Sequence, residues 1–517
     1  MSSENSNENK NSGIKRRDWL KGLATLPVFG GLAWSALSKW NSDHEKKSQV
    51  LKELGISDIQ IDDASSVSKS KSDLIRVGII GFGHRGRFQA RQLGYADPKW
   101  IAYAKKNNIL QDWLGQEDLN VAITGICDVF EDHAQLGVTA SDCEYKSSRI
   151  KARQYKDYRE MLASDDIDAV IITTPDFHHA PMSVLAAQAG KHVYCEKCMT
   201  RTEDEVYDVS EAVNGNNIIY QLGHQYHQNS SYVQAKEVIR KNILGKITLI
   251  QTTSNRNTSH GAWVRHLDAS GKPKPGSPES IDWDLWLGHS PDVPFSIDRY
   301  YNWTKWWDYA TGLSGQLMSH EIDTANQLLG LGIPHSCVAS GGIYFHKDNR
   351  EIPDIFHATF EYPGQELTFM YSASLASDRD RGRLFLGHDA SMNLGNQLEI
   401  TINPNSTRYK DQIERGVFDL SQPAVAYNPG KNKIDAITSA SEKFYASRGL
   451  YYTYRAGKRV DTTFLHLKEW LSAIRHSTPV SVPIEKAVEV TIACHMATKS
   501  YREKRRVTWD PEKFRIV

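Results

Sequence analysis

The chain has 517 residues, which is long enough for two or three domains with sizeable cores. Lys and Arg number 62 and Asp and Glu also number 62, so the formal net charge is zero, with no basic field to attract nucleic acid. Six cysteines are too sparse for a disulfide framework, and the pair Cys195-x-x-Cys198 lacks the second pair of a four-thiolate zinc site. We therefore expect no nucleic-acid partner and no metal site.

The N-terminal segment has the features of an export signal. Residues 1–14 are polar and typical of a disordered tail. The stretch Lys15-Arg16-Arg17-Asp18-Trp19-Leu20-Lys21, followed by an apolar run over 22–37, resembles a twin-arginine signal. The run is about 16 residues long, short for a spanning helix, and an uncleaved anchor over 22–40 is the alternative. We expect a signal or anchor over 1–40, a linker or short helix over 41–73, and a periplasmic or otherwise exported protein.

A glycine motif follows the first predicted strand, at 75–80. The strand leads into Gly81-x-Gly83-x-x-Gly86, and the next residues can open a helix. In this setting the first glycine permits a tight turn, the second lets the backbone approach a pyrophosphate, and the third lets helix and strand pack closely. We expect cofactor contacts from Gly81, Phe82, Gly83, His84, Arg85 and Gly86. An ordinary glycine-rich turn is the alternative.

Strands and helices alternate from residue 74 to about residue 212. Strands are predicted at 75–80, 121–127, 168–173 and 192–195, and helices at 86–93, 130–140, 157–164, 178–189 and 202–213. This alternation predicts a doubly wound parallel sheet, interrupted by an insertion over 94–120. A last strand at 218–222 would complete a dinucleotide-binding domain over 74–222.

Asp128 stands at the end of the second predicted strand. A carboxylate there accepts hydrogen bonds from the adenosine ribose hydroxyls and repels a 2′-phosphate, which favours NAD over NADP. Its spacing from Gly86 is about 40 residues rather than the usual 20 or so, which we ascribe to the 94–120 insertion. A cap for the helix at 130–140 is the alternative role, and both roles are compatible.

Polar residues also follow the next two strands. Thr174-Pro175-Asp176-Phe177-His178-His179 follows one, and Glu196-Lys197-Cys198 follows the other. Both segments therefore lie at the edge where parallel sheets bind ligands. A lysine there can hydrogen-bond the nicotinamide ribose and a substrate hydroxyl, and the positive cofactor ring would lower the pKa of that lysine.

The pattern changes after residue 223. A helix is predicted at 230–241, followed by strands at 246–255, 334–345, 354–362, 366–374, 382–386 and 397–402. With few helices between them, these strands predict a mostly antiparallel sheet with one face open. Residues 403–458 are irregular and read as an insertion, and two helices follow at 461–475 and 484–502. The tryptophans between Trp263 and Trp307 indicate either a stacking surface for sugars or an ordinary core.

In order and setting, these motifs resemble the Gfo/Idh/MocA oxidoreductases. The resemblance rests on the glycine motif, Asp128, Thr174-Pro175-x-x-x-His179 and Glu196-Lys197, and covers roughly 74–515. It implies an α/β Rossmann domain followed, over 223–517, by an α+β domain with an open-faced sheet. It also implies NAD contacts from Thr174, Pro175, His179, Glu196 and Lys197. Gln225 is a further expected cofactor contact, because it follows the predicted strand at 218–222. The family usually has Glu-Lys-Pro, where this chain has Cys198.

Residues 312–323 resemble the family's catalytic helix. The family places Asp or His four residues before a His, so that both project from one face. Here these positions hold Gln316 and His320, and because Gln cannot transfer protons, Lys197 and His320 are expected to carry the acid–base work. For His320 the alternative is a helix residue bonded to the backbone. Expected substrate contacts are Tyr226, Arg256 (with His260), Gln316 and Asp323. For Asp323 the alternative is a place on a solvated helix face.

The resemblance implies hydride transfer from a hydroxyl-bearing carbon of a sugar or cyclitol. An exported enzyme has no free NAD pool, so we expect tightly held NAD and a redox-neutral cycle. An alternative within the family is glycoside hydrolysis by transient oxidation, elimination, hydration and re-reduction, and another couples oxidation of one sugar to reduction of a second. A non-catalytic sugar sensor is the non-enzyme alternative. Since open-faced sheets often pair with a copy of themselves, a homo-oligomer is also expected.

Overall fold

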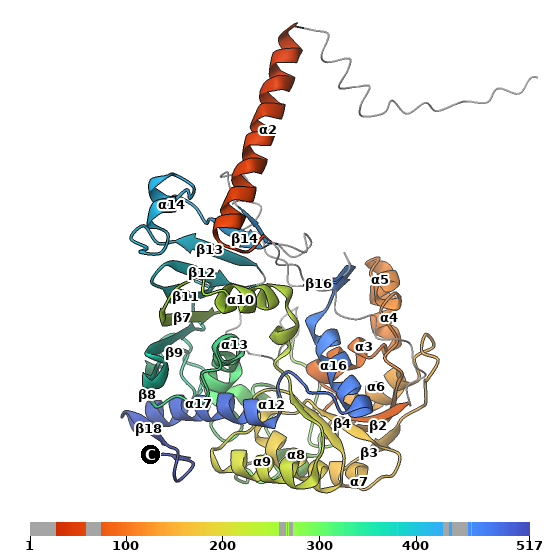
Figure 1. Ribbon diagram of the computed structural model, residues 1–517. Coiled ribbons are helices and arrows are strands. Elements are labelled where there is room, and N and C mark those ends of the chain that lie inside the picture. Colours follow the sequence, from red (N-terminus) through yellow and green to blue (C-terminus); the bar gives the residue numbers. More distant parts are fainter. Residues whose placement is uncertain are drawn as a thin grey trace, which may run out of the picture.

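The computed structural model describes residues 27–57, 74–257, 265, 267, 272–379, 381–395, 397–427, 434–436, 453–455 and 458–517. It shows a parallel-sheet domain beside a domain built on a larger sheet, and a long helix, α2 (Pro27–Glu53), that projects away from both (Figure 1). Arg16, Arg17 and the tail before them lie outside the described residues.

The first domain is a six-stranded parallel sheet, which confirms the predicted doubly wound fold. The strand order is β3-β2-β1-β4-β5-β6, and every neighbouring pair is parallel. Helices cover both faces, so strands such as β2 are buried along their whole length, as their unbroken apolar sequences require. The strands are β1 (Ile75–Ile80), β2 (Val121–Cys127), β3 (Arg153–Tyr155), β4 (Ala169–Ile172), β5 (His192–Cys195) and β6 (Tyr220–Leu222).

The predicted helices of this domain all form, and the predicted insertion is itself helical. Residues 94–120 contain α4 (Pro98–Lys106) and α5 (Leu110–Leu114), and α4 begins where the Asp97 side chain accepts hydrogen bonds from the backbone amides of Lys99 and Trp100. The remaining helices are α3 (His84–Gln92), α6 (Glu131–Ser141), α7 (Tyr158–Leu162), α8 (Asp176–Gln188) and α9 (Asp204–Asn216).

The second sheet has eleven strands in the order β15-β14-β13-β12-β11-β7-β10-β9-β8-β18-β19. Among the described residues of this sheet, only β7 and β10 pair in parallel, which confirms the mostly antiparallel prediction. The predicted strands form as β7 (Ile247–Asn255), β8 (Ser336–Gly342), β9 (Ile355–Tyr362), β10 (Leu367–Ser374), β11 (Arg383–Gly387) and β13 (Leu398–Ile402). Strands that the sequence did not indicate are β12 (Ala390–Leu394), β14 (Val425–Tyr427), β15 (Ile434–Ala436), β18 (Val507–Asp510) and β19 (Arg515–Ile516).

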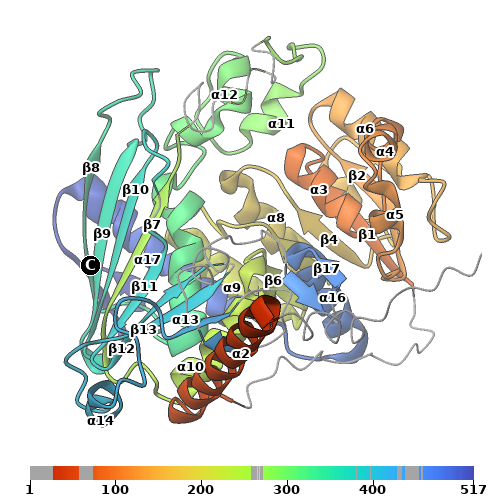
Figure 2. The same cartoon turned by 90° about the horizontal axis from the view of Figure 1, so that it is seen from above.

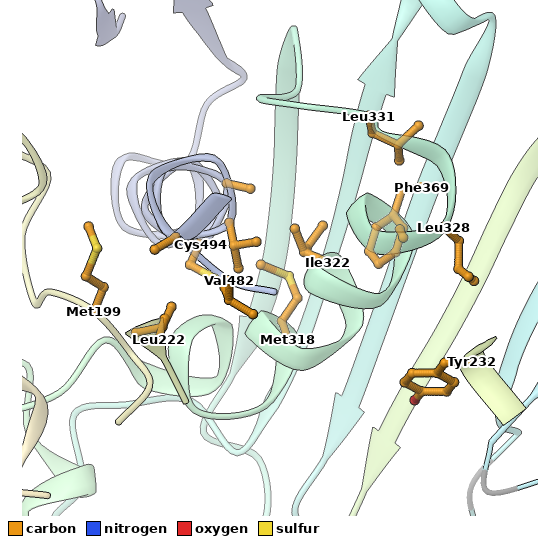
Figure 3. Packing of buried hydrophobic residues seen from close by; sticks show 14 of the residues in the cluster. Met199, Leu222, Tyr232, Met318, Ile322, Leu328, Leu331, Phe369, Val482 and Cys494 are labelled. Atoms are coloured by element: carbon orange, nitrogen blue, oxygen red, sulfur yellow. The ribbon is translucent and has the colours of Figure 1, made fainter. Parts of the chain in front are cut away.

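Helices α10 (Ser230–Arg240), α13 (Ser319–Leu329) and α17 (Ile484–Glu503) lie along one side of the large sheet (Figure 1). Figure 3 shows the core between them, where Met318 and Ile322 face Cys494 of α17 and Phe369 of β10. A π-helical turn, η3 (Ser314–Met318), leads directly into α13. This packing fixes the helix that carries Gln316 and His320.

Helix α16 (Thr462–His476) belongs to the core of the first domain, although the sequence boundary at 223 assigned it to the second. Leu467 and Trp470 are fully buried among residues of β1, β2 and α3. The His466 ring of α16 forms a 3.0 Å hydrogen bond with the Tyr194 hydroxyl of β5. The chain therefore crosses between the two domains more than once, and the cleft between them is bounded by both.

The end of α2 is part of the folded body. Val50 and the following Leu54 and Ile56 are buried in the main core, and Glu53 pairs with Arg415 beside α14 (Lys410–Glu414). The helix spans the boundary between the predicted signal segment and the predicted linker. Across the described residues, none of the helices combines the length and apolar character that a membrane span requires.

Candidate active site

A cavity of about 1350 Å³ lies between the two domains, at the carboxyl ends of β1, β2, β4 and β5. Most predicted site residues line it, and they come from both domains. From the first domain these are Gly81, Gly83, His84, Arg85, Asp128, Thr174, Pro175, Glu196 and Lys197, and from the second Gln225, Arg256, Gln316 and His320. Phe82, Gly86, His179, Tyr226 and Asp323 lie behind this lining.

The glycine loop leaves room for a phosphate group at the start of α3. Gly81 has φ of +87°, a backbone conformation that favours glycine. A Cβ atom on Gly86 would lie 2.2 Å from the Gly81 carbonyl oxygen, whereas one on Gly83 would meet only His133, at 4.0 Å. The loop is thus closed on its inner side and open on its cavity side, as a pyrophosphate at a helix N-terminus requires.

Asp128 holds the glycine loop while it lines the cavity. One carboxylate oxygen accepts a hydrogen bond from the Phe82 amide at 2.5 Å, and the other accepts one from the Phe130 amide at 2.9 Å. Helix α6 begins after Phe130 without a side-chain cap. The carboxylate keeps lone pairs for further donors, which fits ribose hydroxyls at the end of β2.

Glu196 ties the glycine loop to β5. Its Oε1 accepts hydrogen bonds from Arg85 Nε at 2.7 Å and from Gln89 Nε2 at 2.5 Å, both on α3. A Cβ on Gly223 would come within 3.1 Å of this carboxylate, so that position leaves space for it. Arg85 and Glu196 were both predicted to contact the cofactor. In the structure they pair with each other, and both also line the cavity.

His179 connects the two loops at the strand ends. Its Nδ1 lies 2.5 Å from the Cys198 carbonyl oxygen and its Nε2 lies 2.8 Å from that of Thr174. Burial opposes a charge on this ring, but contacts with Cys195, Asp176 and the Cys198 carbonyl raise the pKa of His179 to about 10. His179, expected as a cofactor contact, thus supports the loop that carries Lys197, and the Lys197–Cys198 peptide bond in that loop is cis.

Lys197 reaches across the cleft to the second domain. Its Nζ donates to the backbone oxygen of Gln316 at 2.9 Å and to the side-chain Oε1 of Gln316 at 3.1 Å. Burial lowers the pKa of Lys197, although Asp176 and Glu196 oppose that shift. A lysine with a lowered pKa can accept a proton near neutral pH.

Asp176 is a site residue that the sequence reasoning did not select. The residue is 1% exposed and lines the cavity, and its carboxylate accepts a hydrogen bond from Gln316 Nε2 at 2.6 Å. The available signal was its place directly after Thr174-Pro175, at the first position of α8. Its link to Gln316 crosses 140 residues of sequence and was not visible in any local pattern.

His320 faces the cavity one turn after Gln316. Its ring packs against Tyr226 and His224, with centroid distances of 4.9 Å and 5.2 Å. Its Nδ1 is buried and has no hydrogen-bond partner within the described part of the chain. Burial, together with nearby His224 and Lys197, lowers the pKa of His320 well below its ordinary value, which favours the neutral ring and makes it a weaker base than a solvated histidine.

Asp323 and Tyr226 support His320 from behind. The Asp323 carboxylate lies 2.9 Å from His227 Nε2 and 3.5 Å from His224 Nδ1, and it is buried rather than on a solvated helix face. Burial opposes its ionisation, but His227 and His224 lower the pKa of Asp323 strongly. Tyr226 lies between His320 and Arg383, whose guanidinium is 5.5 Å from the Tyr226 ring centroid. Neither residue lines the cavity, so the structure places both behind the surface that a substrate would contact.

A segment of the second domain, residues 272–309, lies over the end of the cavity near Asp128, and we call it the cover segment. Asp282 donates its amide to the Val129 carbonyl at 2.8 Å, and the Ser280 carbonyl accepts from the Glu131 amide at 2.9 Å. Tyr300 packs edge-on against Phe130 with a centroid distance of 6.0 Å. Figure 2 shows its two helices, α11 (Trp283–Leu287) and α12 (Ile297–Tyr301), between α6 and the large sheet.

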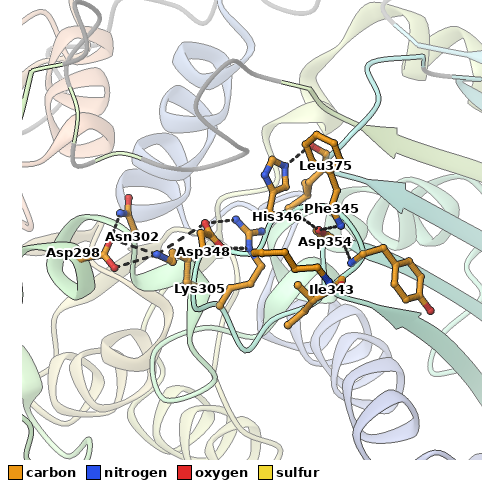
Figure 4. Close-up of polar contacts among 12 residues, drawn as sticks. Asp298, Asn302, Lys305, Ile343, Phe345, His346, Asp348, Asp354 and Leu375 are labelled. Atoms are coloured by element: carbon orange, nitrogen blue, oxygen red, sulfur yellow. Dashed lines mark hydrogen bonds and ion pairs between the residues drawn. The ribbon is translucent and has the colours of Figure 1, made fainter.

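Polar contacts fasten the cover segment to the second domain. Lys305 Nζ lies 3.9 Å from Asp348, outside the segment, and 3.0 Å from Asp298, within it. Figure 4 shows these side chains together. The backbone oxygen of Lys305 also accepts from the amides of Glu351 and Ile352. The segment is thus held on both sides of the cleft.

Most described tryptophans of the predicted aromatic region form a local core. Trp286 and Trp306 are buried with Phe177 and Tyr309, and Trp283 stacks on Trp286 at 4.5 Å. Trp286 and Trp303 also line the cavity. Trp263 and His260 lie outside the described residues. Within the described ranges, no group of three or more His, Cys, Asp or Glu side chains is placed to hold a metal ion.

Two family models match most of the folded body. The one described as "Oxidoreductase family, NAD-binding Rossmann fold" matches residues 75–224. The one described as "Oxidoreductase family, C-terminal alpha/beta domain" matches residues 281–509. Both are models of the Gfo/Idh/MocA group, and the first domain is an NAD-binding Rossmann domain.

Curated relatives and solved structures agree with this match. An inositol 2-dehydrogenase of Salmonella typhimurium strain LT2 is 29% identical over 31% of this chain and 43% of its own. A glycosyl hydrolase family 109 protein of Shewanella baltica strain OS185 is 30% identical over 38% of this chain and 36% of its own. The chain thus spans less than half the length of these relatives. A levoglucosan dehydrogenase solved with NADH and L-sorbose shares the fold, with a TM-score of 0.57, 16% identity, and coverage of 84% of this chain and 98% of that one.

Proposed function

Because this chain belongs to the Gfo/Idh/MocA oxidoreductase family, we propose that it is an NAD-dependent oxidoreductase acting by hydride transfer on a hydroxyl-bearing carbon of a sugar or cyclitol. The observation that carries the proposal is the continuity of one cavity. At one end it has the glycine loop and Asp128, and at the other Lys197, Gln316 and His320. A dinucleotide site and an acid–base pair thus share one cavity.

The protein's own contribution is proton transfer and orientation. NAD, when bound, supplies the hydride acceptor and donor. Lys197, held by Gln316, takes the proton from the substrate hydroxyl as hydride leaves the same carbon, and returns it in the reverse step. We assign a second proton transfer, at a neighbouring carbon, to His320 because it lies at the same cavity wall.

We further propose that NAD is held through repeated turnovers. The cover segment lies over the Asp128 end of the cavity and is fixed to both domains by backbone hydrogen bonds, and the Lys305 side chain adds a 3.9 Å contact with Asp348. Release of a dinucleotide would require these contacts to open. The twin-arginine-like segment supports the same idea, because folded proteins use that route and an exported enzyme meets no free NAD pool. An uncleaved anchor over 22–40 is compatible with this cycle.

A second candidate function is net glycoside hydrolysis. The alignment with the glycosyl hydrolase family 109 protein favours it, as does the presence of two proton-transfer groups in one cavity. In this route a sugar hydroxyl is oxidised, the neighbouring C–H loses a proton, and the glycosidic group departs. Water then adds to the double bond and the ketone is reduced back, which balances the redox change. Oxidation of one sugar coupled to reduction of a second is also redox-neutral.

One set of measurements tests these proposals. The purified chain is denatured and the supernatant is examined for NAD by absorbance and chromatography. Sugars, cyclitols and aryl glycosides are then assayed without added cofactor, in H₂O and in D₂O. Bound NAD with turnover supports the held-cofactor cycle, and deuterium at the carbon beside the oxidised one identifies the hydrolytic route. A protein that is purified without NAD and turns over only when NAD is added contradicts the held-cofactor cycle. Bound NAD without turnover supports a non-catalytic sensor. Lys197→Ala is expected to abolish turnover in every catalytic case.

The proposal includes a homo-oligomer. Val338 of β8 is 50% exposed and Met370 of β10 is 41% exposed, which leaves apolar side chains on the outer face of the large sheet. A second copy covering this face would bury them. Analytical ultracentrifugation of the chain and of a Val338→Lys, Met370→Lys variant checks the assembly, which the double variant is expected to weaken.

A further inference from the structure

Asp176, Gln316 and Lys197 form a chain of hydrogen bonds across the domain boundary. Asp176 begins α8 of the first domain, Gln316 lies in the π-helical turn η3 of the second, and Lys197 follows β5 of the first. Gln316 donates from Nε2 to Asp176 Oδ2 at 2.6 Å and accepts at Oε1 from Lys197 Nζ at 3.1 Å. The amide of Gln316 therefore lies between a carboxylate and an ammonium group.

The two contacts of Gln316 determine which way its amide faces. A carboxylate accepts but does not donate, and an ammonium donates but does not accept. Asp176 thus requires the NH₂ group and Lys197 requires the oxygen, so only one amide orientation satisfies both. A charged lysine has three N–H donors, of which two go to Gln316 O and Oε1. One remains for a reacting oxygen in the cavity.

Asp176 is itself rigidly held. Besides Gln316, its Oδ2 accepts from the Thr311 hydroxyl at 2.9 Å and from the Thr311 amide at 3.2 Å. The turn between these residues approaches the Lys197 loop closely, because a Cβ on Gly315 would lie 1.9 Å from Thr311 Oγ1 and 3.0 Å from Cys198 Sγ. π-helical turns inside helices often occur at functional sites, and here the turn brings Gln316 to both partners.

Building on the proposed function, we propose that Asp176 is a positioning residue for Lys197. It fixes the Gln316 amide with its oxygen toward Lys197, and it supplies the negative charge that position 316 lacks in this chain. Lys197 would then keep one donor aimed at the substrate oxygen and a pKa suited to both accepting and returning a proton.

The other groups around Lys197 do not provide this charge in the same way. Glu196 is adjacent in sequence, but its carboxylate pairs with Arg85. His320 is neutral, and burial raises the pKa of the thiols of Cys198 and Cys494, which keeps them uncharged. Arg265 is a cation and acts in the opposite direction. Asp176 is the carboxylate that both faces Lys197 and contacts its hydrogen-bond partner.

The test measures the titration of Lys197 directly. Reductive methylation of Lys197 is followed by mass spectrometry across pH in the full-length chain, and kcat/KM is measured across the same pH range. In Asp176→Asn the loss of the anion should shift both titrations to lower pH by about one unit, with at least a tenfold loss of kcat as the amide gains a second orientation. In Gln316→Glu a new carboxylate beside Nζ should shift them to higher pH. The opposite signs distinguish a charge effect from a general disturbance.

Thr311→Val is the matched control, since it removes a hydrogen bond to Asp176 without changing charge. We expect this variant to lower the free energy of unfolding and to leave the pH at which Lys197 titrates unchanged. An unchanged Lys197 titration in Asp176→Asn, or a shift of equal sign in Gln316→Glu, overturns the proposal. If Asp176→Asn does not fold, Gln316→Glu alone decides. A parent chain without turnover defeats the proposed function, whereas the methylation titration still reports on Asp176.

Discussion

Arg85 on the glycine loop donates from Nε to Oε1 of Glu196, 2.7 Å away and 111 residues later in the sequence. The pair fastens the start of α3 to the end of β5, and Glu196 is only 9% exposed at its side chain while Arg85 is 28% exposed. Glu196→Gln would leave Arg85 largely buried without a counter-charge. We expect it to lower the free energy of unfolding by about 2 kcal/mol, below the full cost of a completely buried pair because Arg85 keeps some solvent, and to weaken NAD binding.

Urea unfolding followed by fluorescence measures this change. Glu366→Gln provides the control, because Glu366 pairs with Lys246 at an exposed surface. That variant should leave the free energy of unfolding close to that of the parent chain. Equal effects of the two substitutions would show that the Arg85 contact is no more than a surface ion pair.

The fold was largely predictable because its strongest signals are local. The run into Gly81 and the β-branched strands of the parallel sheet have periods that sequence reveals, and their bounds agree with the structure to within a few residues. The large sheet was predicted from alternating strands in the same way. Its added strands were missed where they are short, as with β18 and β19, which pair with each other and join the sheet through β8, far earlier in the sequence.

Site residues were predictable only where they belong to a recognisable sequence motif. Lys197 and His320 follow recognisable patterns, and both line the cavity. Asp176 was missed because its partner Gln316 is far away in sequence and reaches it through a π-helical turn that no periodicity indicates. The cover segment was missed for a related reason, since its aromatic residues signal either a core or a binding surface, and the contact between Tyr300 and Phe130 depends on tertiary structure alone.

Asp128 should determine the preference for NAD over NADP. Its carboxylate lies at the end of β2 and lines the cavity, where it would bind ribose hydroxyls and repel a 2′-phosphate. In Asp128→Asn we expect NAD affinity to fall by about tenfold, the effect of roughly one charged hydrogen bond, and discrimination against NADP to shrink. Chromatography of the nucleotide released from purified protein measures the ratio.

Asp132 is the matched control for this substitution. It lines the same cavity from α6 but is exposed and lies one turn further along. Asp132→Asn should leave the NAD to NADP ratio as it is in the parent chain. A ratio that responds equally to both substitutions would attribute the preference to the general charge of the cavity and not to Asp128.

Tyr300 should slow the release of NAD. Its ring packs on Phe130 and lines the cavity, so it helps the cover segment close over the Asp128 end. Tyr300→Ala removes that contact, and we expect bound NAD to dissociate at least about tenfold faster, because burial of an aromatic side chain contributes on the order of 2 kcal/mol. Retained NAD is measured after timed dialysis. Tyr344→Ala, at a side chain that is 69% exposed in the β8–β9 connection, should retain NAD like the parent chain.

His178 should make the protein less stable in acid. Its Nε2 lies 2.7 Å from the Trp286 carbonyl of the cover segment, and burial lowers the pKa of His178 from its ordinary 6.5 to about 4. The unfolded chain therefore binds a proton near pH 6.5, while the folded chain binds it only near pH 4. The stability contributed by neutral His178 is complete above pH 6.5 and is lost as pH falls through 4, by about 3 kcal/mol for this one group.

His178→Gln keeps a donor for the Trp286 carbonyl but does not titrate, so its free energy of unfolding should fall less steeply between pH 7 and pH 4 than that of the parent chain. Urea unfolding at pH 7, 5.5 and 4 measures both slopes. Buried His320 and His495 have lowered pKa values and act in the same direction in both proteins, so the difference between the slopes isolates His178. His335→Gln, at an exposed position, should keep the parent slope. Parallel slopes for His178→Gln and the parent would mean that His178 takes up its proton in the folded protein as readily as in the unfolded chain.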